Sequence, residues 1–117
     1  MAGIIFLRTR ILDQIRSFYL EDIGMDLWLE QEDCIILRHD NLLLGFCQRE
    51  EADLQGMITF YFDKNEEVDD YHERFEETAD APPRTNPKYN IYHFFCKDPE
   101  GRTLEFQRFL SEVRSPC

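Results

Sequence analysis

Residues 98–106 read DPEGRTLEF and join a tight turn to the start of an extended segment. Pro99 suits the second position of a type I turn, and Gly101 suits a position that needs a positive φ. Segments 91–97 and 102–109, on either side, are rich in aromatic and β-branched residues. Such composition is typical of strands. We therefore predict two strands joined by this turn at the end of the chain.

The sequence before these strands predicts one more strand, a helix and a weak strand. Residues 57–63 (MITFYFD) have the composition of a strand, whereas residues 66–79 place apolar side chains along one helical face. Residues 84–89 contain a proline, so this segment fits only the edge of a sheet. Residues 56–110 therefore have the order β-α-β-β-β.

The first half of the chain, residues 3–50, repeats this order. A strand is predicted over 3–9 and a helix over 11–23, ended by Gly24. Period-two patterns then predict three strands, at residues 26–30, 34–39 and 42–48. The repeat is too long for a solenoid unit and indicates a duplicated module. We expect an α+β protein in which residues 1–117 form a single domain.

Composition limits the class of function. The 117 residues include 13 Lys+Arg and 24 Asp+Glu, for a net charge of −11, and 43% are hydrophobic. This acidic balance disfavours nucleic acid, whose phosphates are bound by Lys and Arg, and suits a cationic ligand better. No stretch has the length of a signal peptide or of a membrane span, so we expect no membrane contact and a cytoplasmic protein.

The chain contains four cysteines, Cys34, Cys47, Cys96 and Cys117, without a C-x-x-C pair. An even number permits two disulfides, but nothing in the sequence suggests secretion. We therefore expect buried, reduced thiols.

The sequence resembles the vicinal oxygen chelate superfamily, which includes glyoxalase I, extradiol dioxygenases and the fosfomycin and bleomycin resistance proteins. The resemblance rests on the D-P-x-G-x-x-x-E-F motif at 98–106, on Ser17-Phe18-Tyr19 followed by Ile23-Gly24, and on the repeated βαβββ order. It implies two βαβββ modules that form a cup-shaped open β-barrel around one ligand or metal site, with the helices on the outside.

Metal-dependent members of this superfamily have ligands at four positions, which fall here near Ile4, Gly45, Met57 and Glu105. Only Glu105 offers a donor that suits a hard or borderline divalent ion. The resemblance therefore implies no metal, no cofactor and no catalytic residue. Within the superfamily, the sequence is most similar in type to the metal-free bleomycin resistance-like proteins.

Strand alternation predicts which side chains line the cup. The predicted ligand-binding residues are Phe6, Trp28, Met57, Thr59, Tyr61, Glu105 and Gln107. Glu105 would meet a cation or a hydrogen-bond donor; alternatively, it pairs with Arg8 or Arg102 and has no further role. The aromatic residues could instead fill a core, and Trp28 could lie at a subunit interface. His93, in an apolar strand, is interpreted as a structural histidine.

The leading hypothesis is a metal-free small-molecule binding protein that sequesters an organic, cationic ligand, as antibiotic resistance proteins of this type do. The resemblance implies a homodimer, and the exposed edges of the predicted sheets also favour one. Two alternatives stay open. One is a metal-dependent glyoxalase- or dioxygenase-like enzyme with a different alignment of ligands, and the other is a dimeric scaffold whose cup is filled by its own side chains.

Overall fold

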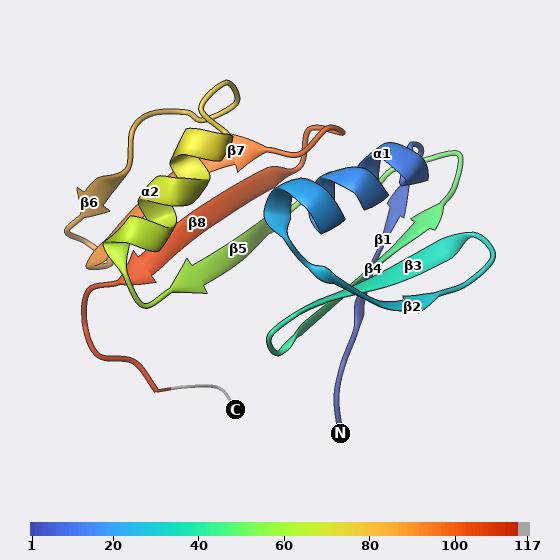
Figure 1. Cartoon of the computed structure of the whole chain (residues 1–117), viewed down its shortest axis with the longest axis horizontal. Coiled ribbons are helices and arrows are strands. Elements are labelled where there is room, and N and C mark those ends of the chain that lie inside the picture. The colour runs from blue at the N-terminus through green and yellow to red at the C-terminus, as the bar shows by residue number, and fades with distance from the viewer. Residues whose placement is uncertain (115–117) are drawn as a thin grey trace. The chain divides into compact units, whose positions relative to one another are not determined.

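A computed structural model describes residues 1–114 of the chain. The described chain divides into two compact units, here called the first module (Met1–Leu54) and the second module (Gln55 to Arg114, the last described residue) (Figure 1). Each module contains one open, four-stranded mixed sheet with helical structure. The predicted α+β class and the repeated βαβββ order are confirmed. That the two modules make a single domain stays a prediction.

The first module begins with a strand and a helix and continues as a three-stranded meander. Its elements are β1 (Ile5–Thr9), α1 (Leu12–Ser17), the π-helix η1 (Phe18–Ile23), β2 (Asp26–Glu30), β3 (Cys34–His39) and β4 (Leu42–Gln48). The sheet order is β1-β4-β3-β2, with β1 parallel to β4. The single helix predicted over 11–23 is thus an α-helix that continues as a π-helix and ends at Gly24, whose φ is 93°.

One face of this sheet packs under the helical segment. Phe46 and Leu37 are fully buried there, and the Tyr19 ring lies 4.9 Å from that of Phe46. On the opposite face, the Phe6 ring covers Gly45 so closely that a Cβ atom at position 45 would lie 2.4 Å from Phe6 Cδ1. Glycine is therefore the residue that admits Phe6 in this position.

The second module has the elements β5 (Met57–Phe62), α2 (Asn65–Arg74), β6 (Arg84–Asn86), β7 (Ile91–Lys97) and β8 (Thr103–Phe109), with sheet order β5-β8-β7-β6. The helix is shorter than the predicted 66–79 because Phe75, with φ −112°, leaves the helical conformation. The N–H groups of Thr78 and Ala79 then bond to the Phe75 carbonyl in a turn. Strand β6 ends before Pro87 and lies at the sheet edge, as predicted.

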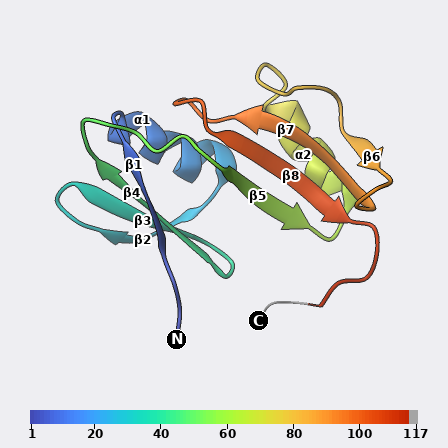
Figure 2. The same ribbon diagram turned by 180° about the vertical axis from the view of Figure 1, so that it is seen from behind.

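The core of the second module is an aromatic cluster around Phe106, which includes Tyr71 of helix α2. This helix lies over one face of the sheet (Figure 1). The fully buried Phe106 ring stacks on Tyr71 at 4.7 Å, on Phe94 at 5.4 Å and on Phe60 at 5.5 Å between ring centroids. The reverse view shows the other face of the sheet, with α2 behind β8 (Figure 2). Helix α2 thus covers only one face of this sheet.

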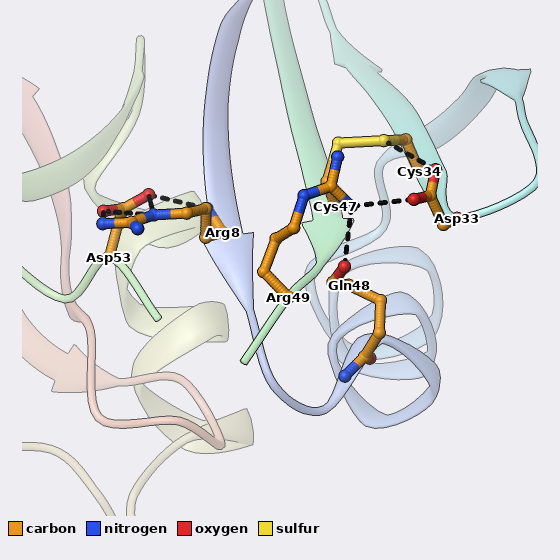
Figure 3. Close-up of a disulfide and its surroundings, with 7 residues drawn as sticks. All are labelled: Arg8, Asp33, Cys34, Cys47, Gln48, Arg49 and Asp53. Carbon is orange, nitrogen blue, oxygen red and sulfur yellow. Dashed lines mark hydrogen bonds and ion pairs between the residues drawn. A yellow bond between two sulfur atoms is a disulfide. The ribbon is translucent and has the colours of Figure 1, made fainter. Parts of the chain in front are cut away.

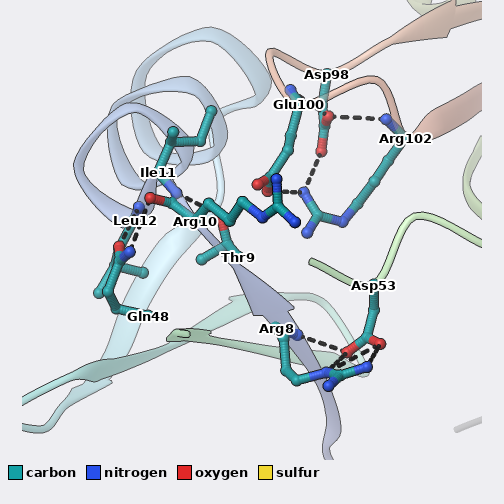
Figure 4. A network of polar contacts seen from close by, with 10 residues as sticks. All are labelled: Arg8, Thr9, Arg10, Ile11, Leu12, Gln48, Asp53, Asp98, Glu100 and Arg102. Carbon is teal, nitrogen blue, oxygen red and sulfur yellow. Dashed lines mark hydrogen bonds and ion pairs between the residues drawn. The ribbon is translucent and has the colours of Figure 1, made fainter. Parts of the chain in front are cut away.

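The turn between β7 and β8 takes the conformation that its sequence predicts. Gly101 has φ 95°, and the Asp98 carboxylate accepts hydrogen bonds from the N–H groups of Glu100 and Arg102. The buried Arg102 guanidinium contacts Asp98 at 3.2 Å and Glu100 at 2.9 Å (Figure 4). Arg102 therefore belongs to the turn.

Arg8 is engaged in the first module. Its guanidinium lies 2.8 Å from Asp53 (Figure 4) and 3.5 Å from Glu51. Hydrogen bonding and charge from Asp53 raise the pKa of Arg8 above its ordinary value. The alternative that Glu105 pairs with Arg8 or Arg102 is thus wrong. Arg8 binds Asp53 and Glu51, Arg102 binds Asp98 and Glu100, and Glu105 has other partners, described below.

The expectation that all cysteines are reduced is wrong for Cys34 and Cys47, which form a disulfide (Figure 3). The physical reason is the register of β3 and β4: their short turn pairs His39 with Leu42, and the ladder then places Cys34 opposite Cys47. Cys96 is free and buried, as expected. Cys117 lies outside the described residues. Within residues 1–114, no helix has the length and apolar character needed to cross a membrane.

The aromatic cluster leads to a stability prediction. Phe106→Ala should lower the free energy of unfolding by about 3–5 kcal/mol, since it removes a fully buried ring and leaves a cavity among the five rings that contact it. Phe109→Ala, in the same strand but on the less buried opposite face, should cost much less. Urea unfolding of both variants measures the difference, and equal losses would contradict the position given to Phe106.

Candidate ligand-binding site

The face of the second-module sheet opposite α2 combines polar and aromatic side chains. Because side chains alternate along a strand, Glu105 and Gln107 of β8 lie on this face while Phe106 lies in the core. Thr59 of β5 is paired with Glu105, and His93 of β7 is paired with Gln107. Three neighbouring strands thus bring four polar side chains together.

The Glu105 carboxylate lies at the centre of this group and is only 4% exposed. Its Oε1 accepts hydrogen bonds from the Thr59 hydroxyl at 2.9 Å and from Gln107 Nε2 at 3.3 Å. Its Oε2 lies 2.7 Å from Nδ1 of His93, which is itself 5% exposed. A buried carboxylate requires such partners, since an unpaired charge there would be strongly unfavourable.

This geometry determines how His93 can act. A carboxylate accepts hydrogen bonds, so Nδ1 carries the hydrogen and donates to Glu105. In the neutral ring, Nε2 is then an acceptor, and no hydrogen bond of Nε2 occurs within residues 1–114. Gln107 Oε1 is likewise a buried atom without a partner among the described residues. The cluster therefore retains hydrogen-bonding capacity after its internal bonds are made.

The same face encloses a cavity of about 670 Å³. Half of its lining residues are apolar or aromatic, and its polar groups include Glu105, His93 and Gln107. The lining residues are Met57, Arg84, Thr85, Asn86, Pro87, Tyr89, Ile91, His93, Phe95, Glu105, Gln107 and Phe109. An apolar cavity with a few convergent polar groups is the usual form of a small-molecule site.

Arg84 contributes a positive charge that is already paired. Its guanidinium contacts Asp80 at 2.9 Å and lies over the Phe95 ring at 5.6 Å. Burial acts to raise the pKa of Asp80, but hydrogen bonds from Arg84 and from the Phe95 N–H outweigh it, so this pKa lies below its ordinary value. Asp80 therefore stays ionised and holds Arg84 at the cavity.

Of the seven predicted binding residues, Met57, Glu105 and Gln107 line the cavity, and Thr59 bonds to Glu105. Tyr61 shares their face, packs edge-on against Phe109 at 5.6 Å and is not among the lining residues. Phe6 and Trp28 belong to the first module. Trp28 is half exposed in edge strand β2, where the register shifts between Leu27 and Leu29.

Sequence reasoning missed His93 and Phe95 as lining residues, together with the segment from Arg84 to Tyr89. The interpretation of His93 as a structural histidine is incomplete: the ring is bonded to Glu105, but it also lines the cavity. A signal existed, because antiparallel pairing across the 98–101 turn places alternate residues of β7 on the Glu105 face.

The donor set does not fit a metal ion of the kind that the metal-dependent members of the superfamily bind. The sheet registers place Phe6 opposite Gly45 and Thr59 opposite Glu105, so neither Ile4 nor Met57 is the direct neighbour of its partner position. Whichever register is used, Glu105 is the one carboxylate or imidazole at these positions. In the described part of the chain, no group of three His, Cys, Asp or Glu side chains could hold a metal ion.

Comparison with known proteins relates the chain to a fold. No protein-family model and no curated protein matches the sequence. A lactoylglutathione lyase from Agrobacterium tumefaciens is similar in structure, with a TM-score of 0.74 and 22% identity, over 92% of each chain.

Two further solved structures agree with this similarity. A glyoxalase/bleomycin resistance protein/dioxygenase family enzyme from Burkholderia phytofirmans PsJN has a TM-score of 0.79 and 18% identity, over 92% of this chain and 97% of that one. TioX from Micromonospora sp. ML1 has a TM-score of 0.75 and 17% identity, over 94% and 99% respectively. The chain thus has the glyoxalase/bleomycin resistance fold, the fold of the vicinal oxygen chelate superfamily, as its D-P-x-G-x-x-x-E-F motif predicts.

Proposed function

We propose that the protein binds a small organic molecule in the second-module cavity. The observation that carries this proposal is the buried His93–Glu105 pair at the wall of an aromatic cavity. Phe95, Tyr89 and Phe109 offer surfaces for the apolar body of a ligand, and His93 Nε2 offers a hydrogen-bond acceptor to its polar group. A pair of this kind is costly to bury, so its place at a cavity wall favours a role in recognition.

The charge balance of the cavity favours a cation through the local field. Arg84 is paired with Asp80, whereas the Glu105 carboxylate has no Lys or Arg partner within residues 1–114. Both Glu105 oxygens already accept hydrogen bonds from protein side chains. A cationic ligand would therefore be attracted by the charge of Glu105 at a short distance and would contact His93 directly.

The similarity in fold also suggests what the bound ligand is for. Two of the similar structures carry the composite name glyoxalase/bleomycin resistance protein/dioxygenase. Of the roles in that name we propose the bleomycin resistance kind here, sequestration of a ligand without metal or chemical change. A cytoplasmic homodimer is proposed with it. One fold hosts many functions, so the cavity supports ligand binding more directly than it supports resistance.

Ligand charge can be tested with two dyes of similar shape, the cationic methylene blue and the neutral Nile red. A dye at about 100 times its dissociation constant should stabilise the protein by about 2.7 kcal/mol, seen as a rise in melting temperature. Glu105→Gln should weaken methylene blue more than Nile red. Glu73→Gln, which removes an exposed carboxylate from α2, is the matched control and should change the affinity for neither dye. Equal losses for both dyes in Glu105→Gln would exclude the charge effect.

The pair itself can be tested for a role beyond stability. His93→Phe or Glu105→Leu alone leaves a buried polar partner unsatisfied and should lower the free energy of unfolding by about 1–3 kcal/mol. The double variant removes both partners and should be less destabilised than the sum of the single changes. It should nevertheless lose the dye-binding signal. A folded double variant that binds both dyes as the wild type does would refute the proposed site.

A further inference from the structure

The disulfide of the first module lies on the sheet face that corresponds to the cavity face of the second module. In the second module, Phe95 pairs with Glu105 and His93 pairs with Gln107. In the first module, the same ladder steps pair Ile36 with Gly45 and Cys34 with Cys47.

The parallel strands agree with this equivalence. Thr59 pairs with Glu105, just as Phe6 pairs with Gly45. The Cys34–Cys47 bridge therefore occupies the positions that His93 and Gln107 occupy in the second repeat. These equivalent positions hold two polar side chains in the second module and a disulfide in the first.

We propose that Cys34 and Cys47 form a reversible dithiol–disulfide site whose reaction partners are small thiols, with glutathione as the representative class. The proposed site is separate from the ligand-binding cavity, because both cysteines belong to the first module and the cavity is lined by residues of the second.

The fold does not depend on the bridge to hold the two sulfurs together. Strands β3 and β4 are paired from Cys34–Cys47 to His39–Leu42, and the core side chains Leu37 and Phe46 lie on the other face. Reduction would leave this ladder and core in place. Both thiols would then stay opposite each other, ready to be reoxidised.

The surroundings of the bridge set which partner can react with it and how fast. Cys34 and Cys47 are buried, at 7% and 9% exposed, so a small thiol is a better partner than a protein thiol. Asp33 Oδ1 lies 3.5 Å from Cys34 Sγ, and Arg49 Nη1 lies 2.8 Å from Asp33 Oδ2 (Figure 3). The carboxylate opposes both an incoming thiolate and a thiolate on Cys34, whereas Arg49 partly cancels that charge.

The exchange is balanced with two equivalents of thiol. A glutathione thiolate attacks one sulfur, the Cys34–Cys47 bond breaks, and the released cysteine thiolate takes up a proton. A second glutathione thiolate then attacks the mixed disulfide, so glutathione disulfide leaves and both cysteines become thiols. Glutathione disulfide reverses the sequence and oxidises the site.

Cys96 is a built-in control for this chemistry. It is buried on the helix side of the second module, and burial, followed by the charges of Asp80 and Asp98, raises its pKa to about 12. Since the thiolate is the reactive form, Cys96 should not react in the folded protein.

The first experiment equilibrates the whole protein in millimolar glutathione buffers with increasing shares of glutathione disulfide. The free thiols are then alkylated and located by mass spectrometry, with circular dichroism recorded in parallel. We expect Cys34 and Cys47 to gain and lose the alkyl label together and reversibly, while Cys96 stays unlabelled and the spectrum stays native. A bridge that resists reduced glutathione until the protein unfolds, or that unfolds the protein when it is reduced, would overturn the proposal.

The second experiment measures the rate of reduction in charge variants. Asp33→Asn should speed reduction several-fold, and Arg49→Gln should slow it, because the first removes the opposing charge and the second leaves it uncompensated. Glu32→Gln and Arg38→Gln remove exposed charges of the same signs that have no contact with the bridge, and they should change the rate less. Rates that are the same in all four variants as in the wild type would refute the electrostatic control of this site.

Discussion

The buried carboxylate of Glu105 is the constraint on which the second module depends. A charge on the central part of a sheet is tolerated only where donors surround it. Thr59, His93 and Gln107 supply those donors from β5, β7 and β8. The requirements of one side chain thus fix the identity of three others and make the middle of this sheet face polar.

Strand alternation separates this polar face from the core. Glu105 and Phe106 are consecutive residues, yet one bonds to His93 and the other stacks among the rings under α2. The fold is stabilised on the helix side, so the opposite face is released from the need to be uniformly apolar. The first module shows the same division with different residues, namely Phe6 over Gly45 and a disulfide on the face opposite the helical segment.

Most of the fold could be predicted from local sequence signals, because turn residues and apolar periodicity act over short distances. The strands at 26–30, 34–39, 42–48 and 91–97 begin and end as predicted. The end of α2 was missed because Phe75 continues the apolar pattern while its backbone has already left the helix.

Both sites depend on which residues face each other across neighbouring strands, and alternation along a single strand predicts only part of this. Alternation along β8 identified Glu105 and Gln107, but His93 becomes their neighbour only through the β7–β8 register. The Cys34–Cys47 bridge likewise follows from the β3–β4 register. The cavity wall from Arg84 to Tyr89 follows an irregular connection, for which the sequence has no periodic signal.

The central claim is that a ligand meets the Nε2 edge of His93, and imidazole nitrogen NMR measures this most directly. The chain has three histidines, so His39 and His72 serve as internal references. With methylene blue or another bound probe, we expect the His93 Nε2 resonance to shift and the His93 Nδ1–H to be preserved. The resonances of His39 and His72 should change little. Binding that leaves His93 unchanged and shifts His39 or His72 would contradict it.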